Sequence, residues 1–369
     1  MLKLPFYAKA SLLIIGLYAF ISILSITKGI LLPVIFAIII AILISPVINF
    51  LVKHGIHRTI SITGVLIIAF LILTTLVIFL SSQASLLFNA LPELTDKFQE
   101  LLNQSVTWCS AYFNISAQKI NAWVINIRAE LSDNSNMAIA NLLSSMGNLI
   151  AAVMITLVYI FLILFYKPLL LEFVYKLFGT RYNSRVDEIL VETKSIIQSY
   201  LFGLFTEFVV VAVLNSVGLL ILGIQYALLF GIAGAFLNVI PYLGGVIAMT
   251  IFAAIALVTK EPIYVFYVLL LYLIVQFIDN NYIVPKIVAS KVKLNAFVSI
   301  FAVLAGAALW GIPGMILSIP LTAIMKLIFD RIDAVKPWGF LLGDTSPPLV
   351  NLKLRMKRNA KHARNGSDK

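Results

Sequence analysis

The sequence predicts an all-α polytopic membrane protein, and three observations support this fold class. Of its 369 residues, 61% are apolar and only 12% are charged, whereas soluble globular chains carry about 25% charged residues. Apolar runs of about 20 residues, the length that crosses a bilayer as a helix, recur along the chain. Two further apolar stretches contain an internal Ile-Pro pair, which a continuous helix disfavours. We therefore expect about six spanning helices and two proline-broken re-entrant hairpins.

Six apolar runs are the expected spanning helices. They cover residues 10–26, 29–52, 59–81, 147–166, 199–223 and 262–282. Two other apolar stretches, 226–259 and 296–329, are interrupted at Ile240–Pro241 and Ile312–Pro313. Proline has no N–H to donate, and its ring disrupts the preceding helical turn. Each half of these stretches has about 15–17 residues, fewer than the roughly 20 that a spanning helix needs.

Two segments between the apolar runs are amphipathic. In residues 82–146, leucines recur at helical spacing and acidic residues outnumber basic ones, which favours an extracytoplasmic position. Residues 167–194 are amphipathic and basic, so we expect them in the cytoplasm. The expected parts are N-terminal transmembrane helices (1–81), an extracytoplasmic amphipathic insertion (82–146), a transmembrane helix with a cytoplasmic amphipathic linker (147–198), an inverted-repeat core (199–330) and a basic cytoplasmic tail (331–369).

The distribution of positive charge predicts the topology. Lysines and arginines fall mainly in short loops and in the C-terminal tail, which is the positive-inside pattern and places both termini in the cytoplasm. If each interrupted stretch is a hairpin, the loop carrying Lys286, Lys291 and Lys293 is also cytoplasmic. If each stretch crosses once, giving eight spanning helices, that loop faces outward. The charge rule favours the hairpins and leaves eight spans as the alternative.

The net charge of +11 does not indicate nucleic-acid binding, because the basic residues do not form a continuous stripe. The tail from Asn351 is strongly basic and lacks apolar periodicity. We expect it to attract anionic membrane lipid and to lie outside the functional core.

The two broken stretches belong to an internal repeat with an offset of 72 residues (241 to 313). GAFLNVIP begins at Gly234, and GAALWGIP begins at Gly306. Upstream, YLFGLFTEF aligns with YLIVQFIDN, which places Glu207 over Asp279. In the hairpin topology the two units are inverted copies, each with a helix, a short loop and a broken hairpin. Such paired, interrupted segments point to the binding site of a secondary transporter.

Acidic and amide side chains within the repeat are the candidate site. Glu207 lies deepest within an apolar run, where an embedded carboxylate marks a solute or proton path. Desolvation favours its neutral form, so we interpret it as the proton-coupling group. Asp279 lies nearer a helix end, and we expect it to be better hydrated and to bind solute or ion. The alternative for Glu207 is a structural hydrogen bond to a neighbouring helix, and the alternative for Asp279 is a polar helix end.

A break in the middle of the membrane also frees N–H and C=O groups that can coordinate an ion or a polar solute, with a simple packing kink as the alternative. The candidate substrate- or ion-binding residues are Glu207, Asn215, Asn238, Pro241, Tyr242, Gly244, Gln276, Asp279, Asn281 and Pro313. The candidate hinge residues at the breaks are Gly234, Gly245, Gly306, Gly311 and Gly314.

The segments NVIPYLGG, QFIDNNYIVPKIV and LWGIPGMILSIPLTAIMK, in this order, resemble the AI-2E (autoinducer-2 exporter) family of membrane transporters, also described as PerM-like permeases. The residues that match the family motifs are Pro241, Tyr242, Gly244, Gln276, Asp279, Asn281, Pro285, Gly311 and Gly314. Pro313 fills a variable position of the last motif. The resemblance implies a bacterial inner-membrane protein that assembles as a homo-oligomer, with a pentamer as the expected form.

What the resemblance implies about activity is divided. The leading hypothesis is a secondary exporter of a small polar solute, such as autoinducer-2, driven by a proton or sodium gradient; the second is a Na⁺(Li⁺)/H⁺ antiporter. A non-transporting membrane scaffold is a remote alternative, because broken hairpins would serve no purpose there. The chain has no P-loop and no catalytic constellation, so we expect neither an enzyme nor a cofactor. One cysteine and three histidines leave little material for a metal centre.

Overall fold

The structure, a computed structural model, describes residues 5–113, 150–179, 182–241, 243–288 and 294–344. Within these ranges the chain is helical almost throughout, and an isolated antiparallel bridge joins Leu294 to Gly343. This is the all-α architecture that the sequence predicts. Expectations for most of the amphipathic insertion, for Tyr242 and for the tail from Asn351 fall outside the described residues.

The N-terminal part forms long helices over the apolar runs. They are α1 (Phe6–Ile26), α2 (Lys28–Lys53), α3 (Arg58–Phe113), a helix over Ile150–Phe165 and α5 (Lys167–Phe178). The last two meet at a bend of 69°. We expected the span 59–81 to end before the amphipathic insertion, but α3 continues beyond residue 81 to Phe113 as one helix of 56 residues. The residues that follow the span are rich in leucine, a good helix former, and the helix continues past Pro92.

The C-terminal part contains the repeat. Its helices are α6 (Asn183–Ile221), α7 (Ala227–Asn238), α8 (Leu243–Thr259), α9 (Ile263–Ile278), the π-helical segment η2 (Asp279–Val288), α10 (Ala296–Trp310), α11 (Ile312–Arg331) and α12 (Lys336–Leu342). Part of the expected cytoplasmic linker belongs to α6, which runs without interruption into the span. The first repeat unit consists of α6 followed by α7 and α8, and the second consists of α9 with η2 followed by α10 and α11.

By length and composition, six helical segments of the described chain can cross a membrane, and the bent pair would make a seventh. α7, α8 and α10 are apolar but shorter, as expected for halves of interrupted stretches. α11 differs from that expectation because it has 20 residues. Its last turns remain helical although they are charged, since Lys326 and Asp330 pair across one turn at 2.5 Å.

Both interrupted stretches fold back on themselves as helical hairpins. In the first, Gly234 of α7 lies against the Phe252 ring of α8. In the second, Gly306 of α10 lies against the Gly314 backbone of α11.

The two breaks are built differently. The first lies where the sequence predicts it, because α7 ends at Asn238 and α8 begins at Leu243. The second falls at Gly311, whose φ of 66° and ψ of −143° are open to glycine. We expected the break at Ile312–Pro313, but Pro313 lies in the first turn of α11, where its missing N–H has no helical partner to lose.

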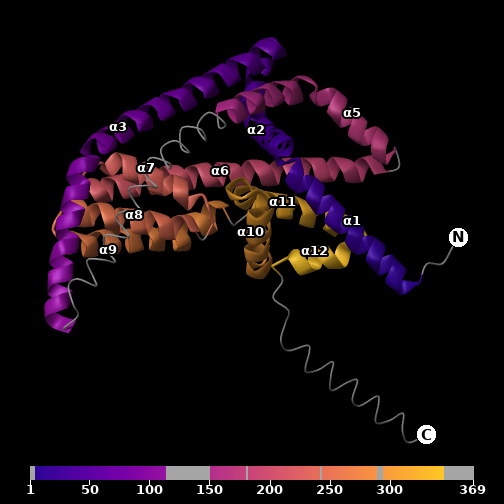
Figure 1. Ribbon diagram of the computed structural model, residues 1–369. Helices are drawn as coiled ribbons and strands as arrows, with labels where there is room; N and C mark the ends of the chain where they lie inside the picture. Colours follow the sequence, from indigo (N-terminus) through magenta and orange to yellow (C-terminus); the bar gives the residue numbers. More distant parts are fainter. Residues whose placement is uncertain (1–4, 114–149, 180–181, 242, 289–293, 345–369) are drawn as a thin grey trace, which may run out of the picture.

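The helices of the first unit stack with α9 around a shared core. Figure 1 shows α6, α7, α8 and α9 running side by side, with α3 crossing one end of the stack, α10 crossing the other and α1 outside. Leu219, Phe252 and Val268 are fully or almost fully buried in this core. α1 instead exposes most of its apolar side chains, as a helix surrounded by lipid does.

The close contact at the second hairpin gives a testable prediction. A Cβ atom on Gly314 would lie 2.0 Å from the carbonyl oxygen of Gly306, so the two helices would have to separate. Gly314→Ala should lower the free energy of unfolding by about 1–3 kcal/mol, the usual cost of overpacking. The readout is the thermal unfolding midpoint in detergent. Gly64→Ala on α3 is the control, since nothing lies within 4 Å of that position; equal effects of both changes would contradict the prediction.

Candidate functional site

Two buried carboxyl groups, one from each repeat unit, meet at one amide. Asn238 Nδ2 donates to Asp279 Oδ2 at 2.8 Å and to Glu207 Oε1 at 3.3 Å. An amide nitrogen carries two hydrogens, so it can serve both acceptors at once. Because both distances end on the same nitrogen, the two carboxyl oxygens lie at most about 6 Å apart. At this range the charge of one acid affects the other.

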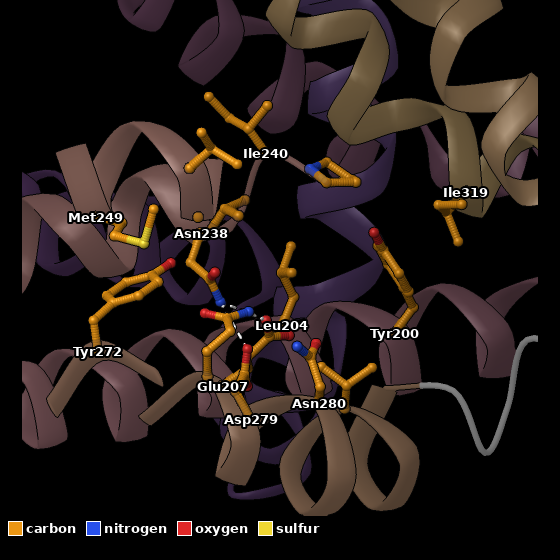
Figure 2. Close-up of a pocket in the computed structure, with 16 residues that line it drawn as sticks. Tyr200, Leu204, Glu207, Asn238, Ile240, Met249, Tyr272, Asp279, Asn280 and Ile319 are labelled. Carbon is orange, nitrogen blue, oxygen red and sulfur yellow. Dashed lines mark hydrogen bonds between the residues drawn. The ribbon is translucent and has the colours of Figure 1, made fainter. Parts of the chain in front are cut away.

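This bridge forms the wall of a cavity of about 480 Å³. Figure 2 shows Asn238 reaching from above between Glu207 and Asp279. The lining comes from α6, the first break, α8, α9, η2 and α11. It consists of Tyr200, Leu204, Glu207, Asn238, Val239, Ile240, Pro241, Gly245, Val246, Met249, Tyr272, Gln276, Asp279, Asn280, Val284 and Ile319.

Local structure explains why these side chains converge. The break after α7 ends the helix at Asn238, so its amide is presented beside α6 and α9. Gly244 makes the tight turn possible, since a Cβ atom there would lie 1.6 Å from the carbonyl oxygen of Leu237. Asp279 is the first residue of the wide π-helical segment, a feature that recurs at functional sites.

Two polar atoms of the cavity have no partner among the described residues. Asp279 Oδ1 and the Tyr272 hydroxyl are buried and unbonded. Buried polar groups are almost always hydrogen-bonded, so each such atom calls for an explanation such as a bound ligand, ion or water. A cavity with a free carboxyl oxygen, a free hydroxyl and the amide of Gln276 can take up a small polar solute or a cation that prefers oxygen ligands.

The structure brings some of the expected residues together and leaves others apart. Glu207, Asn238, Pro241, Gly245, Gln276 and Asp279 line the cavity. Asn215 is buried but lies two turns beyond Glu207, outside the lining. Asn281 is exposed and donates to the carbonyl oxygen of Phe277 at 2.9 Å. Pro313 and the glycines of the second hairpin also lie outside the lining.

Two details of the expected site need correction. We expected Asp279 to be better hydrated than Glu207, but Asp279 is 1% exposed and Glu207 is 7% exposed. The helix continues beyond Asp279 as η2, so the residue is not at a helix end. The carbonyls at the first break are also less free than expected, because Ile240 and Pro241 accept from the N–H groups of Gly244 and Leu243. The break thus contributes mainly the Asn238 side chain.

Ten lining residues were missing from the predicted site, among them Tyr200, Tyr272, Met249 and Asn280. The two tyrosines could have been found from the repeat, because each stands seven residues before its acid (200 and 207, 272 and 279). Seven residues are about two helical turns, so a tyrosine and an acid at this spacing share one helix face. Met249 and Asn280 carry no comparable signal in the sequence.

The bridge predicts a specific loss of stability. Asn238→Ala leaves two buried carboxyl groups without their donor and should lower the free energy of unfolding by about 1–3 kcal/mol. The measurement is thermal unfolding in detergent. Asn281→Ala is the matched control, because that amide is exposed and bonds only a backbone carbonyl of its own helix. A shift of the same size in both variants would show that the bridge does not stabilise the fold.

Comparison with known proteins points to a family of transporters. The family profile described as AI-2E family transporter matches residues 11–334. YueF of Bacillus subtilis (strain 168) is 26% identical over 320 residues, covering 81% of this chain and 83% of YueF. The AI-2 transport protein TqsA of Escherichia coli (strain K12) is 24% identical over 319 residues, covering 85% of this chain and 90% of TqsA. A helical membrane architecture with a profile match across most of its length shows that the chain belongs to the AI-2E transporter family.

Proposed function

We propose that the protein is a secondary active transporter that exports a small polar solute and couples this export to a proton or sodium gradient. The observation that carries the proposal is the amide bridge of Asn238 between Glu207 and Asp279 in a buried cavity. Each acid comes from a different repeat unit. A shift of one unit against the other therefore makes or breaks the bridge.

The bridge gives a physical basis for coupling. Two carboxyl groups this close are costly to keep charged together in a buried site. Neutralisation by a proton or a bound cation therefore changes the stability of the arrangement in which Asn238 bridges the two acids. A solute that competes for the Asn238 amide and for the free oxygen of Asp279 changes the same equilibrium. A ligand can shift two states only by its difference in affinity for them, and this site provides such a difference.

The substrate class follows from the cavity and from one relative. The lining offers hydroxyl, amide and carboxyl groups among apolar side chains, which suits a small polar solute. TqsA is named as a transport protein for AI-2, so an autoinducer-2-like signal is the solute to test first. No cofactor takes part in this proposal.

A Na⁺(Li⁺)/H⁺ antiporter is the second candidate. Asp279 Oδ1 and the Tyr272 hydroxyl have no partner among the described residues, and oxygen ligands of this kind suit a hard cation. In that case the cation and the proton would alternate at the acid pair, and the cavity would not carry an organic solute.

Membrane placement belongs to the same proposal. We place both hairpins as re-entrant elements related by inverted symmetry, in a homo-oligomer of the bacterial inner membrane that is expected to be a pentamer, with both termini in the cytoplasm. The charge distribution supports this orientation. The basic tail would then meet anionic lipid on the cytoplasmic side.

Neutralising the acids tests the coupling. Glu207→Gln and Asp279→Asn keep size and hydrogen bonding but cannot titrate. Each should lower gradient-driven flux by roughly 100-fold or more, the scale on which proton-transfer groups act. The measurement uses purified protein in liposomes, with autoinducer-2 flux and Na⁺- or Li⁺-dependent loss of a pH gradient followed separately. Loss of the first flux supports the exporter, and loss of the second supports the antiporter.

Glu261→Gln is the matched control, because Glu261 is an exposed acid between α8 and α9. If both site variants transport as fast as the wild type with the same pH dependence, the acid pair is structural. If wild-type protein moves neither substrate, the scaffold alternative gains support.

Labelling of single cysteines tests the topology. In a Cys109→Ser background, we expect Lys260→Cys to react with an impermeant thiol reagent from outside and Lys286→Cys to react from the cytoplasmic side. The reason is that a hairpin over 226–259 returns to the side on which it began. Reaction of Lys286→Cys from outside alone would contradict the re-entrant topology.

A further inference from the structure

A second cavity of about 370 Å³ lies between α6 and α11, apart from the acid pair. Its lining is Glu192, Ser195 and Ile196 from α6 with Ala323, Lys326, Leu327 and Asp330 from α11. We call it the vestibule. The cavity of about 480 Å³ lined by Glu207 and Asp279 is called the acid cavity. Unlike the acid cavity, the vestibule is lined by charged side chains of both signs. Lys326 pairs with Asp330 at 2.5 Å, and Glu192 pairs with Arg331.

The vestibule and the acid cavity follow one another along the same two helices. On α6, Ile196 lines the vestibule and Tyr200 lines the acid cavity. On α11, Ala323 lines the vestibule and Ile319 lines the acid cavity. Four residues separate the members of each pair, which is about 6 Å along a helix. The order is reversed on the two helices because they run antiparallel. One helical turn of side chains therefore divides the two spaces.

Two side chains stand at this division. Figure 2 shows Tyr200 and Ile319 facing each other at one side of the acid cavity, away from the Asn238 bridge. Tyr200 is 5% exposed, so its ring fills the space between the helices. A rotation or a small displacement of this pair would join the two cavities.

α11 contains a proline at the same level. Pro320 is buried and lies between Ile319 of the acid cavity and Ala323 of the vestibule. Proline gives no N–H to the preceding turn, and sharp helix bends occur at such positions. The segment from Ala323 onward can thus tilt while the hairpin contact at Gly314 stays in place.

Ion pairs hold the far end of this segment. Arg331 binds Glu188 at 3.0 Å and also binds Glu192, both on α6. All three side chains are partly exposed, with 31% for Arg331 and 54% and 46% for the two acids. Ion pairs of this exposure are weak and sensitive to salt, so they can open and close.

We propose that the vestibule is the cytoplasmic access site for the transported solute. The solute then passes to the acid cavity along the contact between α6 and α11, which we call the α6–α11 seam. In this proposal Tyr200 and Ile319 form the barrier, Pro320 is the hinge and Arg331 is the latch. The inference rests on the proposed transport function. The paired charges nearly cancel, so the lining suits an uncharged polar solute. The start of α6 belongs to the basic segment 167–194, which is expected in the cytoplasm. The vestibule, which lies near this end of α6, therefore opens toward the cytoplasm in this proposal.

The first experiment closes the seam. In a Cys109→Ser background, Ser195→Cys and Ala323→Cys are joined by a short bifunctional reagent that forms a disulfide with each thiol. Autoinducer-2 flux is then measured in liposomes. Flux should fall to background after cross-linking and return on release with a reductant. The control pair is Glu172→Cys with Lys176→Cys on α5, whose parent side chains are exposed and lie 2.7 Å apart. Unchanged flux after complete cross-linking of the seam overturns the proposal.

The second experiment reads the latch without any transport. Ile319→Cys is labelled by a small thiol reagent from the cytoplasmic side, with Arg331 intact or changed to Gln. The rate should rise by up to about fivefold in Arg331→Gln, as expected from loss of a partly exposed ion pair. The double change Glu188→Gln with Glu192→Gln should raise the labelling rate in the same way, and Lys176→Gln should leave it unchanged. Equal labelling rates in folded, monodisperse protein of all variants overturn the latch.

The outcomes separate this inference from the proposed function. If cross-linking of the seam stops flux while Glu207→Gln and Asp279→Asn leave it intact, the route is supported and the role of the acid pair fails. If the acid variants stop flux while the cross-linked seam transports normally, the acid site is supported and the route is overturned.

Discussion

The hydrogen bonds of Asn238 to two buried acids are the constraint on which the core depends. Glu207 comes from α6 and Asp279 from the start of η2, and Asn238 at the end of α7 donates to both. A carboxyl group in an apolar core requires a donor, and the donor here is a single neutral amide. Through this amide, α6, α7 and η2 are linked by hydrogen bonds. A neutral bridge between two acids is also easier to open than an ion pair would be.

The first break exists to place that amide. If α7 continued past Asn238, its next turn would occupy the space where the acid cavity lies. Val239 and Ile240 instead follow the end of the helix and form a wall shared with a further, apolar cavity of about 890 Å³ between α3, α7 and α11. The same short segment therefore separates a polar space from an apolar one. Any displacement of this wall reaches the amide one residue away.

Sequence reasoning could find what depends on local composition and on the repeat. Apolar runs predicted the helices, Pro241 predicted the first break, and the aligned acids predicted that Glu207 and Asp279 belong to one site. It could not find what depends on neighbours in space. The low exposure of Asp279 results from the continuation of its helix and from packing against α6 and α7. The place of the second break was set by the φ of Gly311 rather than by the proline that suggested it.

The two repeat units are alike in sequence order but unlike in use. The first break lines the acid cavity, whereas the second lies near α1, where the Trp310 indole N–H donates to the carbonyl oxygen of Leu24 at 3.0 Å. The second hairpin reaches the cavity through Ile319 in the middle of α11, beside a proline that the first hairpin does not have there. One hairpin thus presents the polar group that holds the acids, and the other presents the apolar side chain of Ile319 beside Pro320. A pair of equal copies would give two equivalent polar contacts, whereas this pair gives a polar bridge on one side of the cavity and an apolar wall on the other.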